Sequence, residues 1–100
     1  MGKSEAKLWV NDNRIELTEF PEVFLAKTLF GVASSLKGTA DIELLEFDLL
    51  HGEVKVIVNG EELTLAPFPN DIIASTLIGL VSSLKGVDKV ESLKIKVRAL

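Results

Sequence analysis

The sequence predicts an α+β fold, a two-layer sandwich in which about six strands form a sheet and two helices cover one face of it. The first observation is an internal repeat: residues 7–49 align with residues 55–97 without a gap, and about 17 of the 43 aligned positions are identical. The second is that each copy holds alternating apolar stretches around one long helical stretch. Two copies are too few for a solenoid, so we expect a tandem duplication of a β-β-α-β unit closing about a pseudo-two-fold axis within a single domain, residues 1–100.

Each copy opens with two strands joined by a tight turn. The segment Val54–Val58 has valine at every second position, as in a strand with one buried face. Asn59 follows with a glycine after it, a strong hairpin signal because both residues accept positive φ. Asn11 occupies the same place in the first copy, followed by an aspartate that accepts this geometry less readily. A hairpin is therefore expected in each copy.

A helix follows each hairpin. Phe-Pro steps at Phe20 and Phe68 predict that the second strand ends there and that a helix starts just after it. The helices are expected to end near Lys37 and Lys85, because the glycine after each lysine suits the left-handed position beyond a helix end. The resulting inner face of the first helix is wide and apolar, made by Phe24, Leu25, Leu29, Val32, Ala33 and Leu36.

The last strand of each copy alternates apolar with charged residues. The outward positions are acidic in the first copy and basic in the second: Glu46, Asp48, Lys94, Lys96 and Arg98. If the two strands are neighbours, opposite charges face each other, and each pair contributes about 0.2–1 kcal/mol. Two alternatives remain: the acidic and basic strands pair between two molecules, or the basic strip binds an acidic partner.

The outer side of the helices carries small residues where charges are usual. A mid-helix glycine costs about 1 kcal/mol relative to alanine, so a glycine at the same place in both helices suggests close packing. We expect the neighbouring helix there first, a second protein chain next and a ligand last. The candidate helix-contact or interface residues are Thr28, Gly31, Ser35, Thr76, Gly79 and Ser83.

Composition narrows the function classes. The chain has no cysteine, which excludes disulfides and thiol catalysis, and its net charge of −4 argues against nucleic acid as a partner. The charge-free run 72–84 is too short to span a membrane. The polar start, MGKSEAK, lacks the apolar segment of a secretory signal, so a cytoplasmic location is expected. Few thermolabile residues fit a thermophilic source.

No constellation predicts catalysis. The twice-written SSLKG closes helix C-termini, whereas phosphate sites use N-termini. His51, the one histidine, lies in the expected turn between the copies. We therefore expect no catalytic, cofactor-binding or metal-binding residue, and a non-catalytic interaction module that self-associates or binds another protein. The alternative is a small-molecule-binding or enzymatic subunit whose site lies between the helices at the pseudo-two-fold, built by Thr28, Thr76 and the two glycines.

Overall fold

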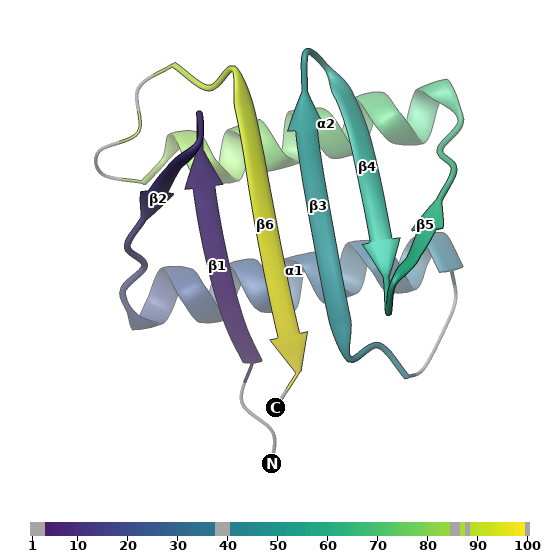
Figure 1. Cartoon of the computed structure of the whole chain (residues 1–100), viewed down its shortest axis with the longest axis horizontal. Coiled ribbons are helices and arrows are strands. Elements are labelled where there is room, and N and C mark those ends of the chain that lie inside the picture. Colours follow the sequence, from purple (N-terminus) through teal and green to yellow (C-terminus); the bar gives the residue numbers. More distant parts are fainter. Residues whose placement is uncertain (1–3, 38–40, 85–86, 88, 100) are drawn as a thin grey trace.

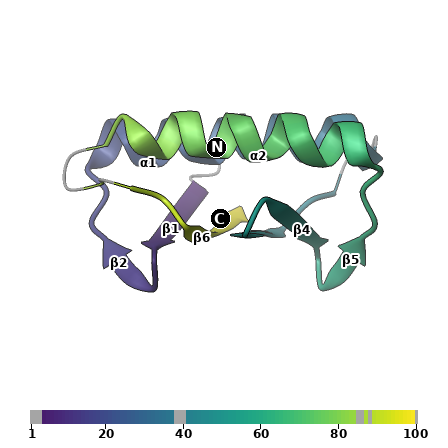
Figure 2. The same cartoon turned by 90° about the horizontal axis from the view of Figure 1, so that it is seen from above.

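The computed structural model describes residues 4–37, 41–84, 87 and 89–99. Its elements are β1 (Ser4–Val10), β2 (Asn13–Ile15), α1 (Glu19–Lys37), β3 (Leu44–Leu50), β4 (Glu53–Val58), β5 (Glu61–Leu63), α2 (Pro67–Ser82) and β6 (Ser92–Ala99). The six strands form one open antiparallel sheet in the order β2-β1-β6-β3-β4-β5 (Figure 1). Both helices cross the same face of this sheet (Figure 2), which confirms the predicted α+β fold of six strands and two helices.

The two central strands, β3 and β6, come from distant parts of the chain. Phe47 of β3 lies opposite Ile95 of β6 at the middle of their register. The predicted charge pairing is confirmed, because Lys96 Nζ lies 3.6 Å from a carboxylate oxygen of Glu46. Lys94 Nζ and Asp48 Oδ1 are 4.0 Å apart in the second pair.

The core lies between the sheet and the helices because every second side chain of the long strands faces the helix layer. Phe47 and Ile95 are fully buried there, as are Leu29 of α1 and Leu77 of α2. The sequence also placed Phe24 on this inner face, which is wrong: its side chain is 49% exposed. A helix resting on a flat sheet buries a narrower stripe than the full apolar arc of a helical wheel.

The predicted hairpin turns are confirmed. Asn11 and Asp12 adopt φ of 50° and 68°, and Asn59 and Gly60 adopt φ of 50° and 85°. Left-handed φ at both central residues gives a turn whose twist matches that of the flanking strands. His51, at 49°, starts a third turn of this kind between β3 and β4.

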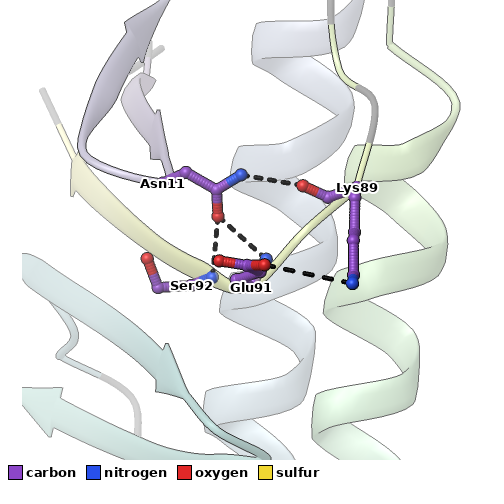
Figure 3. A network of polar contacts seen from close by, with 4 residues as sticks. All are labelled: Asn11, Lys89, Glu91 and Ser92. Atoms are coloured by element: carbon purple, nitrogen blue, oxygen red, sulfur yellow. Dashed lines mark hydrogen bonds and ion pairs between the residues drawn. The ribbon is translucent and has the colours of Figure 1, made fainter.

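Asn11 has a second role that the turn signal did not predict (Figure 3). Its Oδ1 accepts hydrogen bonds from the backbone N–H groups of Glu91, at 2.8 Å, and Ser92, at 2.9 Å. Its Nδ2 donates to the carbonyl oxygen of Lys89 at 2.7 Å. One turn side chain therefore fixes the segment that enters β6, and we call this set of contacts an asparagine clasp.

Asn59 forms a second asparagine clasp at the entry to β3. Its Oδ1 accepts from the N–H groups of Glu43, at 2.8 Å, and Leu44, at 2.9 Å. Its Nδ2 donates to the carbonyl oxygen of Asp41 at 2.8 Å. Each turn thus holds the start of a central strand that belongs to the other half of the chain.

The helix starts differ from the prediction. Helix α1 begins at Glu19 and α2 at Pro67, so each Phe-Pro step lies inside the first turn rather than before it. The first helical bonds confirm this, since the N–H of Glu22 donates to Thr18 and that of Asn70 to Ala66, both at 3.1 Å. A proline is tolerated there because first-turn N–H groups have no partner within the helix.

The helix ends agree with the prediction in α1 alone. Helix α1 ends at Lys37 as expected, whereas α2 ends at Ser82, three residues before the predicted end at Lys85. The N–H of Leu84 turns back to the carbonyl of Val81 at 3.0 Å, an i to i−3 bond that tightens the last turn. The glycines expected to stop the helices, Gly38 and Gly86, lie outside the described residues.

Candidate functional site

The outer surface of the helix layer is apolar and exposed. Large side chains that the sheet does not cover gather on both helices: Phe20, Val23, Phe24, Phe68, Ile72 and Ile78. The two most exposed, Phe20 at 75% and Phe68 at 74%, precede the prolines of the first turns. We call this outer surface the helix face.

The early helix starts explain why these phenylalanines project. Because each Phe-Pro step is helical, Phe20 lies one turn before Phe24 on the same side of α1. Their rings stack with centroids 5.8 Å apart and planes inclined by 25°. The pair forms an aromatic ridge along the first turns of α1.

A groove runs between this ridge and the C-terminal turns of α2. It has a volume of about 490 Å³, and its surface is mostly apolar. Phe20 and Phe24 line one side, and Thr76, Gly79 and Ser83 line the other. Small residues on α2 therefore leave room beside the aromatic ridge.

The structure brings half of the predicted site residues together. Thr76, Gly79 and Ser83 share the groove described above. The other three predicted residues, Thr28, Gly31 and Ser35, lie on α1 away from this groove. Both threonines are half-buried, and the glycines and serines are exposed.

The glycines do not lie at a close helix–helix contact within the chain. Apart from the adjacent residues and the backbone of the same helix, a Cβ atom built on Gly31 or on Gly79 would meet no heavy atom of the described residues within 4 Å. The expectation that the neighbouring helix packs against them is therefore wrong for the isolated chain. Each helix directs its buried side chains toward the sheet, and the glycines lie on the exposed side. A second chain at these positions stays a prediction.

The hydroxyl groups at the candidate positions bond to their own helices. Thr76 Oγ1 donates to the carbonyl of Ile72 at 2.7 Å, and Ser83 Oγ to that of Gly79 at 3.2 Å. Ser35 Oγ makes the same bond to Gly31 at 3.0 Å. These donors are satisfied locally, so they do not converge on a position where a polar substrate would bind.

Other chemistry is not assembled elsewhere in the described chain. No group of three or more His, Asp or Glu side chains there could hold a metal ion. His51 is exposed on its turn, and Trp9 is half-buried with the Arg14 guanidinium 5.4 Å from the centre of its ring. Neither described helix combines the length and the apolarity needed to cross a membrane.

The residues that dominate the helix face do not stand out in the sequence. The Phe-Pro steps predict strand ends at Phe20 and Phe68, and the helical periodicity predicts that Phe24 is buried. The available signal was the Phe-Pro step itself, since proline is common in a first helical turn and leaves the residue before it at the exposed start.

No protein-family model, curated protein or solved structure matches the chain.

Proposed function

We propose that this protein is a non-catalytic interaction module that self-associates through its helix face. The observation that carries the proposal is the aromatic ridge beside an apolar groove on a layer with few charges. Contiguous exposed apolar surface of this kind marks interaction sites in soluble proteins. Burying it against a second copy removes the apolar groups from water, which is the main driving force for association.

The size of the helix face supports a second copy as the occupant. The molecule measures 35 by 34 by 18 Å, and the helices extend across its broad side (Figure 2). A standard protein interface takes about 800 Å² from each partner, which this broad side can supply. Two sheets would then enclose a double layer of helices.

The shape of the helix face also suits self-association. A two-fold dimer uses the same patch on both partners, so the patch must carry both projections and recesses. Here Phe20 and Phe24 project beside the recess at Gly79 and Ser83. Gly31 and Gly79 have open space where a Cβ atom would lie among the described residues, so a second copy could approach closely there.

The proposal includes the duplication predicted from the sequence. Two β-β-α-β units, at residues 7–49 and 55–97, related by a pseudo-two-fold axis, would give the helix face two equivalent ridges. The strand registers support this duplication. Leu8 pairs with Ile95, and Phe47 pairs with Val56; an offset of 48 residues converts Leu8 into Val56 and Phe47 into Ile95, so the two pairs occupy equivalent places. The two asparagine clasps follow the same offset.

A small apolar ligand in the groove is the second candidate. The volume of about 490 Å³ and the apolar lining favour it. The hydroxyls of Thr76 and Ser83 weigh against a polar substrate, because both already donate within α2. An enzymatic role would need an acid or base to activate the hydroxyls of Ser75, Thr76 or Ser83, and the described residues that line the groove include neither.

The test is the mass of the protein in solution. Sedimentation equilibrium of the wild type should give twice the mass of one chain, 10.9 kDa. Phe20→Lys places a charge on the aromatic ridge and should raise the dissociation constant at least about tenfold. The matched control is Leu50→Lys, because Leu50 is 56% exposed on the opposite side of the sheet. This control should remain dimeric.

Two results would contradict self-association through the helix face. One is a wild-type monomer across the micromolar range, and the other is equal weakening by the two lysine variants. Native mass spectrometry on the same samples distinguishes the second candidate, since a bound small molecule adds its own mass to a monomer.

A further inference from the structure

The face of the sheet opposite the helices is uncovered in the described chain. Side chains that alternate with buried ones along β1, β6, β3 and β4 point to this side. The β1-β2 and β4-β5 hairpins turn away from the helices, so they flank the open face (Figure 2). A hollow of about 650 Å³ lies on it, with Trp9 and Lys94 toward one side and Lys55 and Glu62 toward the other.

Charge divides the open face into two halves. On β2, β1 and β6 the outward side chains are mostly cationic: Lys7, Arg14, Lys94, Lys96 and Arg98, with Glu5 as the acidic member. On β3, β4 and β5 the charged outward side chains are mostly anionic: Glu46, Asp48, Glu53 and Glu62, with Lys55 as the basic member. We call these the basic half-sheet and the acidic half-sheet.

The basic half-sheet keeps like charges together. Lys7 lies directly opposite Lys96 in the β1-β6 register, an arrangement that destabilises a sheet. In the acidic half-sheet Lys55 lies opposite Asp48, an attractive pair. Within the described residues Lys7 makes no ion pair within 4.0 Å, and neither do Arg14 and Arg98. Lys94 and Lys96 pair with carboxylates of β3, and Arg98 lies opposite Glu5, so Lys7 is the lysine of this half-sheet for which the described fold supplies no opposite charge.

Trp9 lies among these cations. Its cross-strand neighbours on the open face are Arg14 on β2 and Lys94 on β6. The Arg14 guanidinium lies over the indole ring, and Trp9 borders the hollow. The corresponding place in the acidic half-sheet has Ile57 between Glu62 and Glu46. An aromatic surface flanked by cations fits a ligand that is both anionic and partly apolar.

We infer that the basic half-sheet binds an acidic, extended polypeptide segment of a partner protein. Carboxylates of the segment would pair with Lys7, Lys94 and Lys96, and an apolar side chain would rest on Trp9. The spacing fits, because outward residues recur every second position along β6 and an extended peptide has the same repeat. The open face lies opposite the helix face, so this inference does not depend on self-association.

A peptide fits this surface better than a nucleic acid. The acidic half-sheet begins on the strand next to β6, about 4.8 Å away, so a phosphate backbone over Lys94 and Lys96 would also lie against Glu46 and Asp48. An extended peptide can direct carboxylates to one edge and neutral or basic groups to the other.

The single tryptophan of the chain gives a direct readout, because any change in its emission comes from Trp9. The probe is a synthetic peptide of alternating glutamate and serine with one central phenylalanine. Titration should produce a saturable change in Trp9 emission. Raising sodium chloride from about 20 to about 200 mM should weaken the affinity about tenfold, since exposed charge pairs are screened.

Two matched variants localise the binding. Lys7→Glu should weaken the peptide affinity at least about tenfold, because it reverses a charge in the basic half-sheet. Lys55→Glu makes the same substitution and the same change of net charge in the acidic half-sheet, and should leave the affinity within about twofold. Both lysines are exposed on the open face, and circular dichroism checks that both variants fold.

Three outcomes overturn the inference. The first is an unchanged Trp9 emission across the titration, and the second is an equal loss of affinity in both lysine variants. The third is tighter binding of a single-stranded oligothymidylate of about ten nucleotides, which would replace the peptide by nucleic acid as the occupant.

Discussion

The two half-sheets have matching backbones and contrasting outer surfaces. In both, an asparagine with φ of 50° closes the outer hairpin and binds the entry to the central strand of the same half-sheet, β6 for Asn11 and β3 for Asn59. On the open face, however, Trp9 among cations stands where the other half has Ile57 among carboxylates. Packing and backbone bonding constrain the inner positions, whereas the outer positions are free to differ. The two half-sheets therefore differ mainly on the open face, where the proposed peptide site lies.

The largest loss of stability is expected from shortening the Phe47 side chain, which lies at the β3-β6 boundary between the two half-sheets. Phe47 is fully buried opposite Ile95, so Phe47→Ala should lower the free energy of unfolding by about 3–5 kcal/mol. Urea denaturation measures the loss. Ile57→Ala, at a half-buried position on the open face, is the control and should cost about 1 kcal/mol. Similar losses at both sites would contradict the placement of the core.

Removing the asparagine clasps tests whether the halves are equivalent. Asn11→Gly keeps the left-handed φ accessible but removes the acceptor for two N–H groups, and should cost about 2 kcal/mol. Asn59→Gly should cost the same within about 0.5 kcal/mol, because its contacts have the same lengths within 0.1 Å. Thermal unfolding of the two variants would refute the equivalence if the losses differed by more than about 1 kcal/mol.

The first turn of each helix bonds to the edge of the sheet, and the loss of stability on removing this bond should differ slightly between the two half-sheets. Glu22 Oε2 accepts from the N–H of Ala6 at 3.0 Å, and Asn70 Oδ1 accepts from that of Val54 at 2.8 Å. Asn70 also donates to the carbonyl of Gly52 at 2.9 Å, a bond that glutamate cannot make. Alanine at either site should cost about 1 kcal/mol, with the larger loss at Asn70. A larger loss at Glu22 in urea denaturation would reverse this ranking.

The ion pairs between β3 and β6 should contribute least. Lys96→Ala removes a contact of 3.6 Å between exposed and half-buried groups, and should lower stability by about 0.2–1 kcal/mol. The loss should shrink further in about 1 M salt because the pair is screened. A double-mutant cycle with Glu46→Ala isolates the pair, and a coupling that is unchanged by salt would show that packing rather than charge joins these side chains.

The sequence predicted the elements whose signals are local. The alternation along Val54–Val58, the turn at Asn59 and the end of α1 at Lys37 each follow from neighbouring residues. The repeat offset also predicted that acidic and basic strands could face each other, as Glu46 and Lys96 do. The strand, the turn and the helix end depend on backbone geometry that a few adjacent residues determine, whereas the facing of Glu46 and Lys96 was predicted only on the condition that their strands are neighbours.

Features that depend on distant contacts could not be read in this way. The insertion of β6 between β1 and β3 is a non-local choice among strand orders with the same local pattern. The exposure of Phe24 depends on how the helix rests on the sheet. The small size of Gly31 and Gly79 indicates that a neighbour could approach, and the described chain provides no such neighbour.

The position of β6 also has a kinetic consequence. Strand β6 joins the β2-β1 hairpin to the strands β3, β4 and β5, yet it follows every other described element in the chain. During synthesis the two parts of the sheet must wait, with the facing edges of β1 and β3 unpaired, until residues 92–99 have left the ribosome. Pairing across so much sequence slows folding, and unpaired edges invite pairing with other chains. The nascent protein is therefore most exposed to aggregation just before its sheet closes.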